Sequence, residues 1–256
     1  MAVIHEQRRD GRLYQVRTAG ASLRLYTNGV LHSQINPGKR ALPNLWHLLT
    51  TPALLVEPRQ LKRVLVLGVG GGGVLRLLNE IFPDIHITGI EHDPIHLELG
   101  KRFFGLDCDN FELIADDAFN WLENAPPKRN NHYDLVIDDL FGDFDGDPRR
   151  AVSFDHHWAS LLEKRMSPHG VLVANFADAG EFRRSAIGPR SNHIARFTQR
   201  ASLSLATLEN IVAVMSSTPF SNSDWLAAIS DHFGSKMAGA CTIRRYKAVK
   251  PSRRLR

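Results

Sequence analysis

A glycine-rich segment and three acidic positions stand at regular intervals between residues 68 and 139, each directly after an apolar run. The segment after Val64-Leu65-Val66-Leu67 has the pattern GxGxxG and contains Gly68, Gly70, Gly72 and Gly73. Glycines between a strand and a helix let the backbone approach a nucleotide closely, and they expose the N-terminal amides of the helix. The pattern predicts a nucleotide-binding loop, with a tight strand-to-helix turn as the alternative.

The acidic positions follow the next apolar runs. Glu91 comes about 20 residues after the loop, where a carboxylate can accept both ribose hydroxyls. In Asp116-Asp117-Ala118, a carboxylate can accept a hydrogen bond from an adenine amino group, or it can cap the next helix. Asp138-Asp139 ends the fourth run, where one side chain is expected to face the cleft because neighbours on a strand alternate. A carboxylate there can orient an amine and take its proton, or it can be a helix cap or loop residue.

These residues require strands that end together at one edge of a sheet. Short apolar runs predict strands at residues 64–67, 85–90, 111–115, 135–137, 171–174, 210–215 and 240–249. Helical spacing predicts helices at 74–81 and 118–124, and Asp93-Pro94 predicts a cap and first turn for another. Alternating strands and helices predict an α/β fold with a Rossmann-like, doubly wound, mostly parallel sheet.

The first 60 residues have a different pattern. Residues 13–17 and 22–26 alternate apolar and polar side chains, and Asn28-Gly29 is typical of a tight hairpin turn. We therefore expect an N-terminal antiparallel β-hairpin unit and connector at 1–60, a nucleotide-binding domain at 61–250 and a basic tail at 251–256.

Composition favours a soluble globular protein. Of the 256 residues, 43% are hydrophobic and 23% charged, and no apolar run approaches the roughly 18 residues of a membrane span. The first residues lack the apolar core of a signal peptide, and Cys108 and Cys241 are expected to be buried thiols, so we expect a cytoplasmic protein.

The formal charge of +5 arises near the C-terminal end. Residues 244–256 contain seven basic and no acidic side chains, and the rest of the chain holds 25 basic and 27 acidic residues. Such an end can bind phosphates, which leaves nucleic acid open as a partner, but a solvated tail is the expectation.

An ordered set of segments resembles spermidine synthases and their relatives, over about residues 12 to 180. The segments are Pro52-Ala53-Leu54-Leu55-Val56-Glu57-Pro58, the glycine loop with its preceding strand, Glu91-His92-Asp93-Pro94, Asp116-Asp117-Ala118, Tyr133-Asp134-Leu135-Val136-Ile137-Asp138-Asp139 and Ser167-Pro168-His169-Gly170-Val171-Leu172-Val173-Ala174-Asn175. The resemblance implies the class I S-adenosylmethionine-dependent methyltransferase fold. It also implies aminopropyl transfer from decarboxylated S-adenosylmethionine to a diamine, by a dimer or tetramer.

The resemblance assigns roles residue by residue. It makes Glu91 the ribose ligand, Asp117 the adenine contact and Asp139 the catalytic aspartate that accepts the proton of the attacking amine. The whole expected donor-binding set is Gly68, Gly70, Gly72, Gly73, Glu91, Asp116, Asp117, Ala118 and Asp138.

Several acidic positions of the family are absent. The loop aspartate that holds the aminopropyl ammonium is Gly71 here, and a second aspartate after the catalytic one is Gly142. The family also has an Asp-Glu pair and a Tyr-His-Glu set before the Rossmann domain. The corresponding residues here are Leu42, Pro43, Trp46, His47 and Leu48, so only the histidine is retained. Because buried cations need matched carboxylates, these losses disfavour a polyamine acceptor, and a neutral Gly71 admits the carboxylate of intact S-adenosylmethionine.

The sequence therefore predicts a transferase that uses S-adenosylmethionine or its decarboxylated form as co-substrate, with methyl transfer slightly preferred. We expect a small-molecule acceptor, a homo-oligomer such as a dimer, no metal and no membrane association. The alternatives are a true polyamine aminopropyltransferase, a non-catalytic adenosyl-binding protein, and a nicotinamide dehydrogenase. The acid after the third strand and the lack of room for a substrate domain weigh against the dehydrogenase.

Two smaller patterns have structural interpretations. His156-His157 can suggest a metal, but Phe154, Trp158, Leu161 and Leu162 recur at helical spacing and favour a core-facing helix. Residues 141–148 are acidic and glycine-containing, and we expect a mobile loop over the cleft.

Overall fold

The N-terminal unit is an antiparallel sheet. The computed structural model describes residues 1–36, 43–124, 132–144, 147–191 and 196–247. Its first sheet has the order β1-β2-β3-β4, formed by β1 (Ala2–Arg9), β2 (Arg12–Ala19), β3 (Ser22–Thr27) and β4 (Val30–Ile35). Asn28 and Gly29 have φ values of 50° and 85°, as a tight turn between β3 and β4 requires. The predicted antiparallel unit is confirmed, and it has four strands where a hairpin was expected.

The second sheet has eight strands in the order β14-β12-β13-β11-β8-β5-β6-β7. The neighbours β11 (Met166–Phe176), β8 (Tyr133–Asp138), β5 (Arg63–Leu67), β6 (His86–Glu91) and β7 (Phe111–Ala115) are parallel. At the other edge, β13 (Ile211–Ser216), β12 (Gln199–Leu205) and β14 (Cys241–Tyr246) pair antiparallel. The prediction of a mostly parallel, doubly wound sheet is confirmed.

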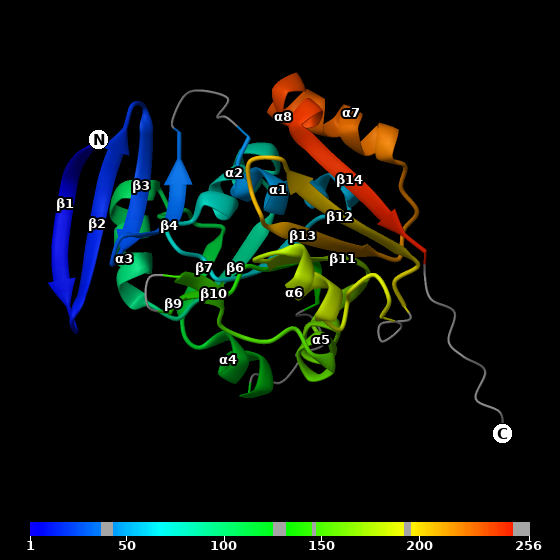
Figure 1. Ribbon diagram of the computed structural model, residues 1–256, viewed down its shortest axis with the longest axis horizontal. Coiled ribbons are helices and arrows are strands. Elements are labelled where there is room, and N and C mark those ends of the chain that lie inside the picture. Colours follow the sequence, from blue (N-terminus) through cyan, green and yellow to red (C-terminus); the bar gives the residue numbers. More distant parts are fainter. Residues whose placement is uncertain (37–42, 125–131, 145–146, 192–195, 248–256) are drawn as a thin grey trace.

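Helices cover both faces of this sheet, as Figure 1 shows. One face packs against α1 (Leu45–Thr50), the 3-10 turn η1 (Thr51–Leu55), α2 (Gly73–Ile81), α7 (Asn222–Phe233) and α8 (Ser235–Ala240). The opposite face packs against α4 (Ala118–Asn124), α5 (His156–Glu163) and α6 (Ala179–Arg184). No helix among the described residues is long and apolar enough to cross a membrane.

The central strand β5 shows why the sheet is buried on both sides. Val64 and Val66 belong to the core beneath α1 and α2, whereas Leu65 and Leu67 belong to the core beneath α4 and α5. All four side chains have no exposed surface. A continuous apolar run is what a strand needs when helices cover both of its faces.

Helix α3 (Pro94–Phe104) joins the two sheets. The Asp93 carboxylate caps it by accepting from the Ile95 N–H over 3.0 Å, and Gly105 ends it with a φ of 71°. Leu99 and Phe104 of this helix share a core with residues of the N-terminal sheet, among them Tyr14, Val16 and Leu25. The four-stranded sheet is therefore packed on α3, beside the loop between β6 and α3.

Two expectations need correction. The expected loop at residues 141–148 is an antiparallel hairpin of β9 (Phe141–Phe144) and β10 (Asp147–Arg150), with Asp145 and Gly146 outside the described residues. The last strand ends at Tyr246, and both the basic tail at 251–256 and Leu42 lie outside the described residues.

Candidate functional site

The glycine loop after β5 adopts a backbone that side chains would disrupt. Gly68, Gly70 and Gly72 have φ values of 84°, 53° and 84°, in the left-handed region that favours glycine. A Cβ atom at Gly68 would meet the backbone oxygen of Asp139, and one at Gly70 would lie 2.7 Å from the His32 oxygen. The loop is therefore held between the end of β8 and strand β4.

The N-terminal sheet lies directly on the second half of this loop. Ser33 of β4 accepts a hydrogen bond from the Gly73 N–H through its Oγ atom, over 3.0 Å. A Cβ atom at Gly71 would be 2.9 Å from Ser33 Cβ and 3.3 Å from Leu25 Cδ2. The space in which a side chain at position 71 would lie is thus filled by two residues of the N-terminal sheet.

Glu91 ends β6, and its carboxylate faces the glycine loop. Its Oε2 atom accepts hydrogen bonds from the Val69 and Gly70 N–H groups over 3.0 and 2.8 Å, and Oε1 accepts from Asp93 N–H over 2.9 Å. Burial alone would raise the pKa of Glu91, but the His96 imidazole and the N–H groups of Asp93 and Gly70 outweigh it and lower the pKa to about 2. The carboxylate is therefore ionised at any physiological pH.

Asp116 and Asp117 follow β7 as the sequence predicts. Asp117 accepts from the Asn120 N–H over 2.9 Å through Oδ1, so it caps α4, and Asp116 accepts from the Asp117 N–H over 2.8 Å. The capping alternative is thus realised for Asp117. Among the described residues, no side chain or backbone group is bonded to its second carboxylate oxygen, while Ala118 is buried at the start of the helix.

Asp138 and Asp139 point to different surroundings, as neighbours on a strand must. Asp138 has no exposed surface, and its Oδ2 atom binds Arg150 over 2.8 Å and the Trp158 indole N–H over 2.7 Å. Arg150 also donates to the Asn175 carbonyl oxygen over 2.6 Å. This ion pair fastens the β9–β10 hairpin to the sheet, and it leaves Asp138 no exposed atom for a ligand.

Asp139 is partly exposed and lies beside the glycine loop. Its Oδ1 atom accepts a hydrogen bond from Asn175 Nδ2 over 2.8 Å. Burial raises the pKa of Asp139 to about 7; Asp138 and Glu91 add to this effect, whereas the Asn175 hydrogen bond and the Arg150 charge oppose it. A carboxyl group with this pKa can exchange a proton near neutral pH.

The structure brings together some but not all of the predicted residues. Glu91 contacts the glycine loop directly, and Asp139 lies against Gly68 at the end of β8. Asp117 follows β7, whose last residue, Ala115, is paired with Glu91. These positions share the carboxyl edge of neighbouring parallel strands, which is where ligands bind in open α/β sheets.

Sequence reasoning missed several residues of the site, among them Asn175, Ser33, His96 and Arg150. Asn175 stands near the end of a predicted strand, so the rule that ligand sites lie at carboxyl ends could have indicated it. The other three reach the site only because the N-terminal sheet, α3 and the hairpin pack around it.

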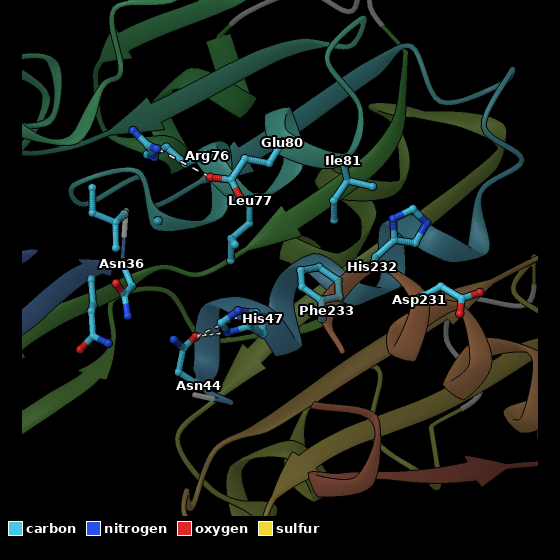
Figure 2. A pocket seen from close by; sticks show the side chains of 13 residues that line it. Asn36, Asn44, His47, Arg76, Leu77, Glu80, Ile81, Asp231, His232 and Phe233 are labelled. Atoms are coloured by element: carbon cyan, nitrogen blue, oxygen red, sulfur yellow. Dashed lines mark hydrogen bonds and ion pairs between the residues drawn. The ribbon is translucent and has the colours of Figure 1, made fainter. Parts of the chain in front are cut away.

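A separate cavity of about 570 Å³ touches the end of the glycine loop at Gly73, between β4, α1, α2 and α7. Figure 2 shows His47 bonded to Asn44 on one wall and Arg76 paired with Glu80 on another. Burial lowers the pKa of His47 to about 4, so this histidine is neutral. None of the predicted carboxylates lines the cavity, which lies on the face of the sheet that α1, α2 and α7 cover.

Similarity to known proteins agrees with this geometry. No family model matches the chain. A polyamine aminopropyltransferase from Corynebacterium efficiens is 31% identical over 186 residues, which are 69% of this chain and 33% of that protein. An eEF1A lysine and N-terminal methyltransferase homolog from Drosophila melanogaster is 39% identical over 82 residues, 31% of this chain and 12% of that protein. The chain thus spans less than half the length of these relatives.

A crystal structure of a probable spermidine synthase from Corynebacterium glutamicum has the same fold. It superimposes with a TM-score of 0.72 at 18% identity, over 96% of this chain and 90% of that one. The two sheets, the glycine loop after β5 and the acidic ends of β6 and β8 are the features that the sequence segments identified. The chain is therefore similar in sequence to spermidine synthase-like proteins, and it has the class I S-adenosylmethionine-dependent methyltransferase fold.

Proposed function

We propose that the chain is a transferase that binds an S-adenosyl donor at the carboxyl ends of β5, β6 and β7 and moves its alkyl group to an amine acceptor. The observation that carries this proposal is the placement of Asp139. Its carboxyl group is held by Asn175 and has a pKa of about 7, and its backbone carbonyl lies against Gly68 of the glycine loop. A proton acceptor is thus adjacent to the loop that would hold the donor.

The residues that would bind the S-adenosyl donor are the glycine loop, Glu91 and Asp117. Glycines at 68, 70 and 72 let the loop pack closely against Asp139, His32 and Leu106 beside Glu91. The ionised Glu91 would supply acceptors for ribose hydroxyls. The second oxygen of Asp117 is available for an adenine amino group. In this proposal Asp138 is a structural residue, because its carboxylate binds Arg150 and the Trp158 indole N–H.

The reaction is a displacement at a carbon attached to a sulfonium. The acceptor nitrogen forms a new N–C bond as the C–S bond breaks, and the bonding pair leaves with sulfur, which becomes a neutral thioether. The proton lost by the nitrogen passes to the ionised Asp139 carboxylate. Most of the acceleration comes from holding donor and acceptor in line, and the base adds to it.

Methyl transfer fits the loop better than aminopropyl transfer does. An aminopropyl ammonium needs a buried carboxylate, and position 71 is a glycine whose side-chain space Ser33 and Leu25 occupy. The buried carboxylates among the described residues are Glu91, Asp93 and Asp138, and each already binds protein groups. Among the described residues, no buried carboxylate is therefore free to pair with an aminopropyl ammonium.

Two other functions remain candidates within this proposal. Relatives named polyamine aminopropyltransferase support aminopropyl transfer to a polyamine. A non-catalytic adenosyl-binding protein would keep Glu91 and the loop without using Asp139. We further propose a small-molecule acceptor, a homo-oligomer, and the division of the chain at about residue 60 between the two sheets.

The proposal is tested by turnover of radiolabelled S-adenosylmethionine and its decarboxylated form with a panel of amines. The wild-type chain is expected to transfer the methyl label, and Asp139→Asn is expected to lower kcat by about a hundredfold or more while donor affinity is kept. Glu123→Gln serves as the control, because this exposed carboxylate pairs with His157 on the surface. Equal turnover by wild type and Asp139→Asn would contradict catalysis through Asp139.

A further inference from the structure

His96 stands between the N-terminal sheet and Glu91. It is the third residue of α3, and its side chain is 5% exposed. Its Nδ1 atom lies 3.4 Å from Glu91 Oε1, and its Nε2 atom lies 2.8 Å from Thr27 Oγ1 at the end of β3. A buried imidazole thus connects the four-stranded sheet to the carboxylate of the candidate donor site.

The surroundings of His96 determine which nitrogen carries a proton. The Glu91 carboxylate is ionised and can only accept, so a bare Nδ1 lone pair at 3.4 Å would be repelled by it. Nδ1 must therefore carry hydrogen. The Thr27 hydroxyl can donate or accept, so it anchors Nε2 in either charge state of the ring.

Further rings hold the imidazole in this orientation. His32 of β4 lies 4.6 Å from the His96 ring centroid, and the Tyr14 ring meets it edge-on at 6.0 Å. Tyr14 is itself bonded through its hydroxyl to Asp93 over 2.6 Å, beside the first turn of α3. The ring cannot rotate away from Glu91 without disturbing contacts from both sheets.

Three backbone N–H groups contact the Glu91 carboxylate: those of Val69 and Gly70 donate to Oε2, and that of Asp93 donates to Oε1. His96 also faces Oε1, and its Nδ1 has no hydrogen-bond partner of good geometry in the described structure. Of the four groups around the carboxylate, the imidazole is the only one that a substitution can remove without altering the backbone.

From these contacts we infer that His96 is a positioning residue of the donor site. It stabilises and orients the Glu91 carboxylate, and through Thr27 it makes donor affinity depend on the docking of the N-terminal sheet. The inference rests on the proposed function, because it assumes that Glu91 binds the ribose of the donor.

The test measures donor affinity by calorimetry and steady-state kinetics. His96→Leu removes the N–H that faces Glu91, and it is expected to raise the Kd and KM of S-adenosylmethionine about tenfold with kcat within about twofold of wild type. His96→Asn retains an N–H near the position of Nδ1 and is expected to recover most of the affinity. Thr27→Val removes only the hydroxyl that contacts His96 Nε2. It is expected to weaken donor binding less than His96→Leu does, by about threefold.

A matched histidine–glutamate pair supplies the control. His86 Nε2 lies 3.6 Å from Glu112 Oε2 on the same sheet, but the two side chains are 44% and 56% exposed. His86→Leu is expected to leave Kd, KM and kcat unchanged. Thermal unfolding of each variant separates loss of fold from loss of binding, and Thr27→Val and His96→Asn carry the test where His96→Leu does not fold.

A second readout needs no donor. The ¹³C resonance of the Glu91 carboxyl should titrate at a higher pH in His96→Leu than in wild type, and at the wild-type pH in His86→Leu. Unchanged donor affinity and unchanged Glu91 titration in His96→Leu would overturn the role of His96 alone. Failure of the wild-type chain to bind any adenosyl donor would instead overturn the proposed function, and this inference with it.

Discussion

The side-chain amide of Asn175 donates a hydrogen bond to Asp139 Oδ1 over 2.8 Å, and its own oxygen accepts one from Asn210 Nδ2 over 3.1 Å. Asn175 lies near the end of β11, next to the strand that carries Asp139. The second amide fixes which way the first one points, so Asp139 always receives an N–H. This contact lowers the pKa of a carboxyl group that burial raises.

Replacing Asn175 by alanine should therefore move the pKa of Asp139 above 7. The ionised form loses a hydrogen bond, and a change of about one pKa unit is expected. The rising limb of the pH–rate profile should shift upward by the same amount, with the rate recovering at pH 9. Asn79→Ala is the control, since Asn79 accepts from Asn110 in a remote amide pair. An unshifted profile in Asn175→Ala would show that this contact does not tune Asp139.

Asp139 should make the folded chain less stable as pH rises. Its pKa is about 7 in the fold against an ordinary value of 3.8, so the unfolded chain releases the proton first. Stability then falls between about pH 4 and pH 7 and stays at the lower level above. Asp139→Asn avoids this loss, so its Tm should exceed that of wild type at pH 8, with the difference shrinking toward pH 4. A lower Tm for the variant at pH 8 would refute the raised pKa.

Glu91, unlike Asp139, should make the folded chain more stable as pH rises. Its pKa of about 2 lies below its ordinary value of 4.5, so the stability it contributes is present above pH 4.5 and is lost as pH falls toward 2. Glu91→Gln should flatten acid unfolding in this range, measured by circular dichroism. It should also weaken S-adenosylmethionine binding by about tenfold or more, because the ribose loses a charged acceptor. Donor binding at wild-type strength would contradict the assigned role.

An aspartate at position 71 should not restore an aminopropyltransferase. Its Cβ would lie 2.9 Å from Ser33 Cβ, so Gly71→Asp should destabilise the chain by about 1–3 kcal/mol in urea unfolding. Gly239→Asp is the control, because a Cβ at Gly239 meets nothing within 4 Å. Removing the obstructing side chain in Gly71→Asp/Ser33→Gly should recover part of the stability. Tight binding of the decarboxylated donor by the single variant would contradict the claim that Ser33 and Leu25 exclude a side chain at position 71.

The sequence was sufficient for the parts of the fold that have strong local patterns. The apolar run of β5, the Asp93-Pro94 start of α3 and the Asn28-Gly29 turn are formed by nearby residues, and each is found where expected. Strand β1 was not predicted because most of its side chains are exposed on both faces, so it has no hydrophobic alternation. The β9–β10 hairpin was missed because glycine and acidic residues are typical of loops.

The sequence predicted only those residues of the candidate site that directly follow a predicted strand. Alternation along β8 indicated that one of Asp138 and Asp139 would face the cleft, and the structure leaves Asp139 partly exposed and Asp138 buried. It could not show that Arg150 neutralises Asp138, since that pairing depends on the hairpin. His96 and Ser33 were not predicted either, because they reach the site only through the packing of the N-terminal sheet on the loop and α3.

Calorimetric titration of the wild-type chain and of Glu91→Gln with S-adenosylmethionine, its decarboxylated form and NAD tests the proposed donor site most directly. We predict that S-adenosylmethionine binds wild type at one site per chain, more tightly than the decarboxylated donor, that Glu91→Gln loses most of this affinity, and that NAD gives no binding heat. Absence of binding by both adenosyl donors, or equal binding by wild type and Glu91→Gln, would contradict it.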